Sequence, residues 1–341
     1  MRLDSLHGPP AQHVRGSKLQ AAANSMRIVA ALGGNALLRR GEAMSEANQR
    51  ANIRAAVAAL MPLVRAGHSL FVTHGNGPQI GMIALQNLNG PPEGICGIDV
   101  LGAQSQGMIG YLIEQEMRNA LPSGRSCATL LTQVLVHQAD ERLQRFEKPV
   151  GPLYVEREAD RLRRERGWAF VHVGPAGAGG AALRRAVPSP KPCEILGIET
   201  LVQLADNGTV VICLGGGGVP VVKDRAGRIS GVEAVVDKDH ASALLARGVG
   251  ADALLLLTDV EGVLDNWATP TQYLLRRIDA DTVDPVVFEA GSMRPKVAAA
   301  RDFALATGKS CAIGRIGESV ALLAGQAGTL VARGKTAETT E

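Results

Sequence analysis

Short runs of apolar residues recur along the chain, and several of them end directly in glycine. Runs of this length that are rich in Val, Ile, Leu and Ala are typical of strands buried on both faces, as in a parallel sheet. They predict strands at residues 27–32, 69–73, 127–134, 209–214, 253–257 and 310–313.

Longer segments with apolar residues at helical spacing lie between these runs. They predict helices at residues 45–64, 100–121, 239–247, 294–307 and 319–323, and residues 223–228 are typical of a hairpin turn. Strands that alternate with helices favour a mostly parallel sheet. We therefore expect an α/β protein, a three-layer sandwich whose open central sheet is covered by helices on both faces.

Residues 140–190 break this alternation. The stretch is first charged and arginine-rich and then rich in glycine and alanine. Two segments within it, 148–152 and 184–190, contain prolines and are expected to be stiff, because proline fixes φ. We interpret the stretch as a flap inserted into a main domain that runs from residue 26 to residue 333.

The two ends of the chain differ from its body. Residues 1–25 carry Pro9 and Pro10 among scattered basic residues and contain no apolar core of a secretory signal. We expect a disordered N-terminal extension at 1–25 and a C-terminal tail at 334–341.

The composition narrows the class of protein. The net charge of +3 is too small to argue for a nucleic-acid or membrane partner, and no apolar run is long enough to span a bilayer. The five cysteines include no Cys-x-x-Cys pair, which argues against a disulfide framework or a zinc site. Unpaired cysteines fit a reducing compartment, so we expect a cytoplasmic protein with no metal site of its own.

Glycine-rich loops follow several of the predicted strands. Gly33 and Gly34 end the first strand, Gly75 follows the second, and residues 215–218 are four consecutive glycines. Ligands of open α/β sheets bind at the carboxyl ends of strands, and glycine lets backbone amides approach an anion closely. The chain lacks the P-loop motif, the dinucleotide-binding glycine motif after its first strand and the Gly-x-Ser-x-Gly elbow, which excludes a P-loop enzyme and disfavours a hydrolase.

Two lysines stand close to these loops in sequence. Lys238 lies in Asp237-Lys238-Asp239 after the four glycines, and Lys296 closes the loop 291–296. A lysine ammonium can neutralise the oxygens of a phosphoryl group during its transfer. Taken alone, Lys238 is better explained by a solvated turn and Lys296 by the start of a surface helix, but the combination with the glycine loops favours phosphoryl transfer.

Motifs in sequence order from Arg27 to Val331 resemble those of the carbamate kinases, a branch of the amino acid kinase superfamily. The resemblance is carried by residues 31–37, 74–79, 99–111, 148–152, 187–190, 215–221, 237–239, 257–260 and 291–296. It implies reversible phosphoryl transfer, ATP + carbamate ⇌ ADP + carbamoyl phosphate, run toward ATP in arginine or purine nitrogen catabolism. It also implies the amino acid kinase fold with an eight-stranded sheet, Mg²⁺ bound with the ATP or ADP, and a homodimer.

The resemblance assigns roles to single residues. It implies that Lys238 and Lys296 contact the transferring group, that Asp239 orients them, and that Lys148 reaches the carbamoyl phosphate from the flap. Phosphate and substrate would be bound by glycine amides and by two asparagine side chains, namely Gly33, Gly34, Asn35, Gly75, Asn76, Gly216 and Gly217. The nucleotide would contact Thr258, Asp259, Val263, Met293 and Pro295, for which packing at strand ends is nearly as good an explanation. His74 is expected to shape a turn rather than to act as a base.

Four positions depart from the pattern of the family. Arg294 stands where glycine is usual, and Leu264 and Leu183 stand where tyrosine is usual. Residues 174–180 replace the usual acidic and glycine-rich lead into Arg184-Arg185, which suggests a looser flap. These departures leave two alternatives open. One is a nucleotide-binding relative with weak catalysis, and the other is an amino acid kinase that acts on a different carboxylate. Against the latter, Ala31-Leu32 stands where such kinases carry a lysine before the glycines.

Overall fold

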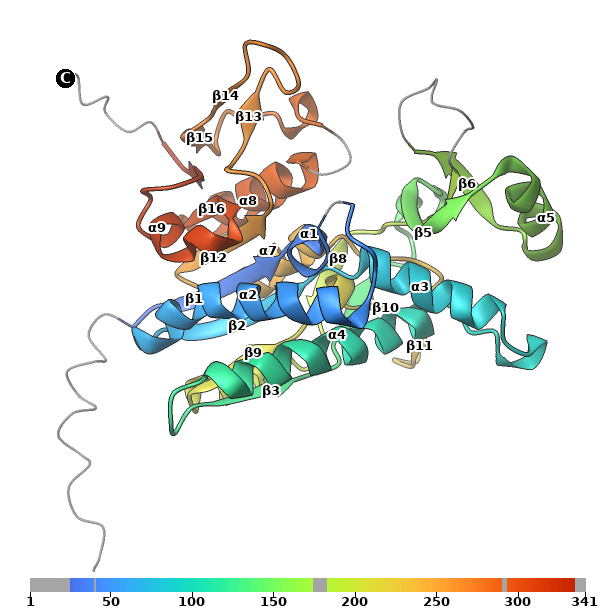
Figure 1. The fold of residues 1–341 in the computed structure, drawn as a ribbon, viewed down its shortest axis with the longest axis horizontal. Coiled ribbons are helices and arrows are strands. Elements are labelled where there is room, and N and C mark those ends of the chain that lie inside the picture. The colour runs from blue at the N-terminus through green and yellow to red at the C-terminus, as the bar shows by residue number, and fades with distance from the viewer. Residues whose placement is uncertain (1–24, 40, 174–182, 290–292, 335–341) are drawn as a thin grey trace, which may run out of the picture.

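The computed structural model describes residues 25–39, 41–173, 183–289 and 293–334. Its centre is an eight-stranded sheet with the strand order β15-β17-β16-β12-β1-β2-β9-β3 (Figure 1). Within the described residues, β16 and β17 form the one antiparallel pair of this sheet, which confirms the mostly parallel arrangement. The strands are β1 (Arg27–Leu32), β2 (Ser69–His74), β3 (Ser126–Thr129), β9 (Thr209–Ile212), β12 (Ala253–Thr258), β15 (Arg277–Asp279), β16 (Ser310–Arg315) and β17 (Thr329–Ala332).

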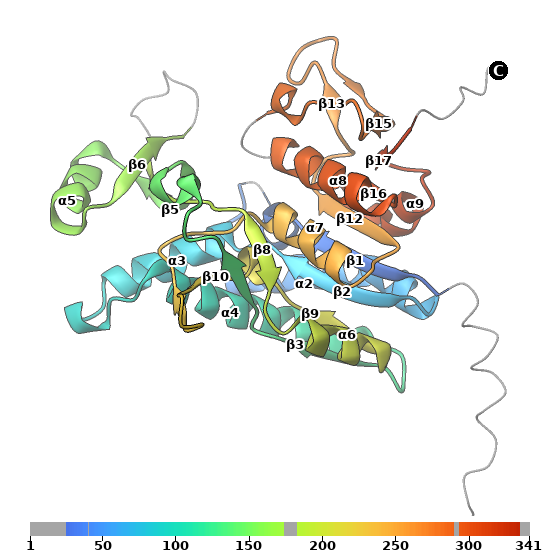
Figure 2. The ribbon, with the colours of Figure 1, turned by 180° about the vertical axis from the view of Figure 1, so that it is seen from behind.

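Helices cover both faces of this sheet, as predicted. Ile28, Ala30 and Leu32 of β1 join one apolar cluster, while Val29 and Ala31 join the other, because successive strand residues point to opposite faces. Figures 1 and 2 show the helices of the two outer layers from opposite sides. The first cluster includes residues of α2 (Glu46–Arg65), α4 (Ile98–Ala120) and α9 (Ser319–Leu323), and the second includes residues of α6 (Ile198–Asp206), α7 (Lys238–Gly248) and α8 (Met293–Thr307).

The register of three central strands brings the first two glycine loops together. Leu32, the last residue of β1, pairs with Leu257 of β12 on one side and with His74 of β2 on the other. The amide of Gly33 then donates to Leu257 O at 2.8 Å, and the amide of Gly75 donates to Leu32 O at 3.0 Å. Both loops therefore leave the sheet at the same point of its carboxyl edge.

The predicted single strand at 127–134 is in fact two strands in different sheets. β3 ends at Thr129, and β4 (Gln133–Val136) joins a four-stranded sheet. The side chain of Gln106 exchanges two hydrogen bonds with the backbone of Thr132, at 3.0 and 3.2 Å, and so holds the chain between the two strands. The other strands of this sheet are β8 (Pro192–Ile195), β10 (Val219–Lys223) and β11 (Ile229–Gly231), the last two forming the predicted hairpin.

Several elements were not predicted. The largest is α3 (Gly77–Leu88), which begins at a glycine–proline pair that suits a first helical turn although it also suits a loop. The hairpin of β13 (Leu264–Asp265) and β14 (Tyr273–Leu274) stands beside the carboxyl edge of the sheet (Figure 1). The remaining short helices are α1 (Gly34–Leu37), η2 (Pro92–Gly94), η3 (Glu141–Gln144), η4 (Gly215–Gly217), η5 (Pro285–Val287) and η6 (Ile316–Glu318).

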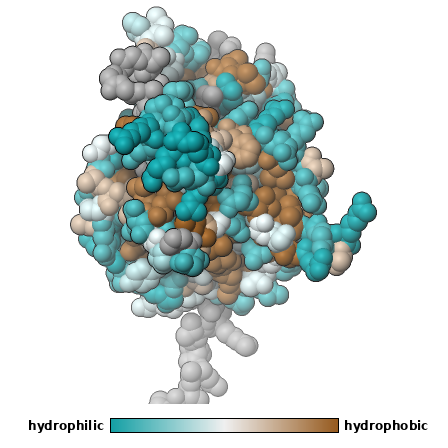
Figure 3. Space-filling model, turned by 90° about the vertical axis from the view of Figure 1, so that its right-hand side faces the viewer, coloured by the Kyte–Doolittle hydropathy of each residue, from teal (hydrophilic) through white to brown (hydrophobic). Residues whose placement is uncertain are grey.

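The described part of the flap contains, after η3, one α-helix and three strands that share a small core. Tyr154, Ala159, Leu162 and Leu183 are buried together, so the leucine at 183 serves as a core residue. Figure 3 views the molecule from the side of the flap, where the surface around its charged helix is hydrophilic. The elements are β5 (Lys148–Tyr154), α5 (Glu156–Arg166), β6 (Ala169–His172) and β7 (Leu183–Val187).

Some expectations fall on residues that the structure does not describe. Residues 174–180, most of the N-terminal extension and nearly all of the C-terminal tail lie outside the described ranges. Among the residues within those ranges, no helix is both long and apolar enough to cross a bilayer.

His74, at the end of β2, is buried beneath the glycine loops. Its Nδ1 lies 3.0 Å from Gly75 O, and the side chain is 1% exposed. Burial, together with the nearby charge of Lys238, lowers its pKa from 6.5 to about 4. The imidazole is therefore neutral at pH 7, in keeping with a structural role for this residue.

This pKa predicts a pH dependence of stability. Between about pH 6.5 and about pH 4 the unfolded chain binds a proton at His74 and the folded chain does not, so stability falls as pH falls. We expect His74 to account for a loss of about 2 kcal/mol in the free energy of unfolding from pH 7 to pH 5. Urea unfolding at the two pH values should show a smaller loss for His74→Gln than for the wild type. The exposed His172 offers a matched control, and an equal loss in His74→Gln and wild type would contradict the assignment.

Candidate active site

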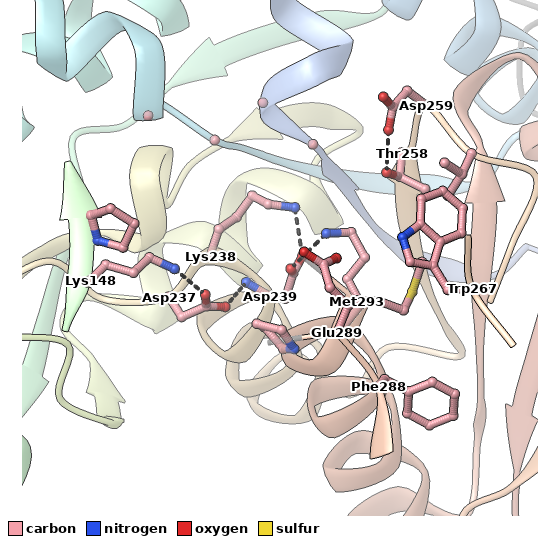
Figure 4. Close-up of a pocket in the computed structure, with 18 of the residues that line it drawn as sticks. Lys148, Asp237, Lys238, Asp239, Thr258, Asp259, Trp267, Phe288, Glu289 and Met293 are labelled. Atoms are coloured by element: carbon pink, nitrogen blue, oxygen red, sulfur yellow. Dashed lines mark hydrogen bonds and ion pairs between the residues drawn. The ribbon is translucent and has the colours of Figure 1, made fainter. Parts of the chain in front are cut away.

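A cavity of about 970 Å³ opens at the carboxyl edge of the sheet. Its walls come from the first two glycine loops, from Gly216, from β5 of the flap, from the start of α7 and from the segment that leads into α8. Figure 4 shows side chains from these elements pointing into one space. Segments that lie far apart in the sequence thus meet at the edge where the glycine loops predicted a ligand.

Lys238 and Lys296 converge on the carboxylate of Asp239. Lys238 Nζ lies 2.7 Å from Oδ1, and Lys296 Nζ lies 3.3 Å from Oδ2 (Figure 4). The two lysine side chains are each 11% exposed, and that of Asp239 is 6% exposed. The two cations therefore meet around one buried anion, as the functional interpretation of the sequence requires.

The start of α7 holds this cluster in place. Asp237 caps the helix, because its side chain accepts from the amides of Asp239 at 2.9 Å and of His240 at 3.4 Å. Lys238 and Asp239 consequently begin the helix, and Asp239 faces the positive end of the helix dipole. Lys296 lies in the first turn of α8, which packs against α7.

Burial and charge act against each other in this cluster. Burial lowers the pKa of Lys238, with repulsion from Lys296 in the same direction, and the attraction of Asp239 offsets only part of this. Burial would raise the pKa of Asp239, but the neighbouring ammonium groups outweigh it and keep the pKa below its usual value. Asp239 is thus ionised, and an anion that enters the cavity would stabilise the charged form of Lys238.

Lys148 of the flap reaches the same cavity from the opposite side. Its Nζ donates to Oδ2 of Asp237 at 2.7 Å. Burial alone would lower the pKa of Lys148, but the carboxylate of Asp237 reverses the effect and raises it. Lys148 therefore carries its charge into the cavity, and the ion pair joins the flap to the start of α7.

Steric crowding explains why glycine occupies these loop positions. A Cβ on Gly75 would lie 3.1 Å from the amide nitrogen of Gly34, so a side chain would force the two loops apart. Gly216 has φ of +66°, which L residues rarely adopt, and a Cβ there would overlap the side chain of Asn76. Close packing of the loops leaves room for their backbone to approach an anion.

The structure brings most of the predicted site residues to the cavity. Those that line it are Gly33, Gly34, Gly75, Asn76, Lys148, Gly216, Lys238, Asp239, Thr258, Asp259, Met293, Pro295 and Lys296. Asn76 also donates from Nδ2 to Ser105 Oγ at 2.8 Å, so part of its donor capacity is committed to α4.

Three of the predicted site residues are not among those that line the cavity. Val263 is fully buried in the apolar core and does not line the cavity, because its strand-end position packs inward. Gly217 lies behind the cavity wall, where a Cβ would overlap Val236 O. The side chain of Asn35 lies outside the described part of the chain, although its backbone begins α1.

One wall of the cavity was missed by the sequence analysis. It is apolar and consists of Leu264, Trp267, Leu275, Val287 and Phe288 together with the predicted Met293. The sequence analysis marks Leu264 only as a departure from the family pattern. Leu275, Val287 and Phe288 lie in short irregular segments, where apolar residues have no period to detect. Trp267 could have been noticed, because a large aromatic residue among turn residues suggests an exposed contact.

Arg294 points away from the cavity. Its guanidinium donates to Phe288 O at 3.1 Å and to Val286 O at 2.9 Å. The arginine that replaces a glycine of the family pattern therefore ties the start of α8 to the segment after η5. It does not enter the space that the cavity offers to a ligand.

Comparison with known proteins gives consistent results over nearly the whole chain. The model of the amino acid kinase family matches residues 26–315. The carbamate kinase of Rhizobium meliloti is 45% identical over 308 residues, which cover 90% of this chain and 93% of that protein. The carbamate kinase of Haemophilus influenzae is 43% identical over 311 residues, which cover 90% and 97%.

Solved structures agree with the sequence matches. The carbamate kinase from Giardia lamblia bound to AMP-PNP superposes with a TM-score of 0.81 at 37% identity, covering 92% of this chain and all of that one. The family model covers residues 26–315, which include every residue that lines the cavity, and the relatives cover about nine tenths of the chain. The chain belongs to the amino acid kinase family, and within it to the carbamate kinases.

Proposed function

We propose that this protein catalyses ATP + carbamate ⇌ ADP + carbamoyl phosphate at the cavity described above. The observation that carries the proposal is the meeting of Lys238 and Lys296 around Asp239 beside the glycine loops. Phosphoryl transfer demands positioning and charge neutralisation more than covalent chemistry. Two ammonium groups at the rim of a glycine-lined cavity meet that demand.

In the direction of ATP synthesis, an oxygen of the ADP β-phosphate attacks the phosphorus of carbamoyl phosphate. The bond from phosphorus to the carbamate oxygen breaks, and carbamate leaves with the electron pair. The attacking group is already an anion, so the step needs no general base. This agrees with His74, which is neutral and held against Gly75. Lys238 and Lys296 stabilise the charge on the migrating group.

The substrate residues divide between the two sides of the cavity. We assign the amide of Gly34 to the phosphoryl oxygens, because the amides of Gly33 and Gly75 already donate to backbone carbonyls of the sheet. We assign Lys148 to the carbamoyl phosphate side. Asp237 supports the latter assignment, because its contact with Lys148 shows that the flap lysine reaches the start of α7. Thr258, Asp259, Met293 and Pro295 would contact the nucleotide.

Magnesium would arrive with the nucleotide, since Mg²⁺ is usually held by phosphates with one or two carboxylates and several waters. The residues present fit this mode. Asp259 lines the cavity, and its Oδ1 accepts from Thr258 Oγ1 at 3.2 Å. Within the described ranges, no group of three or more histidine, cysteine or acidic side chains forms a metal cage of its own. Bound Mg²⁺ would neutralise phosphate charge, with Asp259 as its protein partner.

We further infer a homodimer that makes ATP during arginine or purine nitrogen breakdown. Val100 and Tyr111 support the dimer, because they lie three turns apart on one face of α4 and are 43% and 57% exposed. The pathway rests on the family resemblance alone.

A coupled assay that follows ATP formation from ADP and carbamoyl phosphate tests the reaction. Turnover supports the proposal. Tight ADP binding without turnover would instead favour a nucleotide-binding relative, and activity restricted to an amino acid carboxylate would favour another kinase of the superfamily.

Loss of either converging lysine should cut turnover. We expect Lys238→Ala and Lys296→Ala each to lower kcat about 10²- to 10³-fold, because a preorganised cation is removed from the transition state. The exposed Lys309, which pairs with Asp252, gives the matched control Lys309→Ala. Circular dichroism should confirm that each variant is folded, and near wild-type kcat for Lys296→Ala would refute its role.

Asp239→Asn should change the pH profile. In the wild type, Asp239 raises the pKa of Lys238, so its removal lowers that pKa further. Because the charged lysine is the active form, rate is lost as pH rises through this pKa. We expect the alkaline limb of kcat to move to lower pH. An unshifted limb in a folded Asp239→Asn protein would mean that the carboxylate only positions the lysines.

Lys148→Ala should separate the two substrates. We expect the KM for carbamoyl phosphate to rise more than the KM for ADP, because the flap lysine reaches the cavity from the side opposite the apolar wall. Lys191→Ala, at an exposed lysine near the flap, serves as the control. Equal increases in both KM values for Lys148→Ala would remove the substrate-side assignment.

A further inference from the structure

The indole of Trp267 stands in the wall of the cavity, across from Lys148 (Figure 4). Trp267 lies in the loop between β13 and β14 and is 51% exposed. An aromatic side chain of this size is normally buried or in contact with a partner, because its apolar surface is large. Its exposure at a cavity wall therefore calls for a ligand rather than for core packing.

The backbone on both sides of Trp267 is strained. Asn266 has φ of +49° and Ala268 has φ of +62°, and neither is glycine. Conformations of this kind persist when neighbouring contacts impose them, and they gather at binding sites. Here Asp265 accepts from the amide of Asn266 at 2.9 Å, and Thr269 donates to Asn266 O at 2.7 Å. The loop is thus held in the shape that presents the indole.

The cavity has a cationic end and an end with an apolar wall. Lys148 and Lys238 lie toward the first, while Trp267 lies at the second, where Asp259 is also found (Figure 4). Leu264, Leu275, Val287, Phe288 and Met293 complete the apolar wall. A nucleoside diphosphate has the same distribution, with anionic phosphates at one end and a flat base at the other.

We propose that Trp267 stacks on the base of the bound nucleotide. The proposal rests on the function proposed above, since it takes the nucleotide as the ligand of this wall. Stacking tolerates different bases, because every base has a π face. Trp267 thus strengthens the binding of ADP and GDP alike. It binds the nucleotide at a distance from the lysines, so it affects affinity and not the phosphoryl step.

Fluorescence offers a direct test, because the chain has only two tryptophans. Trp168 lies in the flap, where the guanidinium of Arg185 covers its ring at 4.0 Å. The variant Trp168→Phe leaves Trp267 as the sole reporter. ADP and GDP should change its emission, and inorganic pyrophosphate, which has the phosphates without a base, should not. If the emission of Trp267 does not change at ADP concentrations where calorimetry shows binding, the proposal is overturned.

Calorimetry with Trp267→Ala measures the contribution of the ring. We expect the Kd for ADP to rise roughly tenfold or more, the Kd for pyrophosphate to stay within about twofold, and Trp267→Phe to retain most of the affinity. The control is Tyr273→Ala, which removes an exposed aromatic that donates to Asp265 on the same hairpin but does not line the cavity. An unchanged Kd for ADP in Trp267→Ala, or the same loss in Tyr273→Ala, would overturn the proposal.

These measurements need no turnover, so the two proposals fail separately. A wild-type protein that forms no ATP from carbamoyl phosphate, yet loses ADP affinity in Trp267→Ala, upholds the stacking and rejects the carbamate kinase reaction. A protein that forms ATP, while Trp267→Ala binds ADP as the wild type does, rejects the stacking alone. In an active enzyme, the stacking also requires that Trp267→Ala raises the KM for ADP by a larger factor than it lowers kcat.

Discussion

Two buried ammonium groups that share one carboxylate are the constraint on which the site depends. Like charges about 4 Å apart repel by about 4 kcal/mol at an effective dielectric constant near 20, so Lys238 and Lys296 need a counter-charge to be buried together. Asp239 supplies it, and the helix start that Asp237 caps fixes its position. Both lysines line the cavity, so a phosphoryl group that enters it can contact the two ammonium groups together.

The central sheet positions this charged cluster beside the glycine loops. Register between β1, β2 and β12 sets the first two glycine loops next to one another, and α7 and α8 bring the lysines to the same edge. The flap and the hairpin of β13 and β14 then supply the two remaining walls. Each wall has its own chemistry, because Lys148 places an ammonium group on one and Trp267 places an aromatic ring on the other.

Much of this was predictable from the sequence, and the exceptions have physical causes. Buried parallel strands read as apolar runs, so the sheet and the lysines at its edge were found. The chain between β3 and β4 reads as a continuous strand, because the bonds from Gln106 that separate them come from a distant helix. The family resemblance implies a nucleotide contact for Val263, whereas the fold buries this side chain in the core, as the alternative of packing at a strand end predicts. The apolar wall had no motif at all, since it is assembled from segments without regular period.

The separate core of the flap has a consequence for how changes within it reach the site. Tyr154, Ala159, Leu162 and Leu183 pack with one another and not with the two large clusters around the sheet. The flap meets the rest of the molecule elsewhere, through Val150 and Val187 and through the ion pair of Lys148 with Asp237. A change in the small core can therefore reach the start of α7 only by way of the strands that carry these residues.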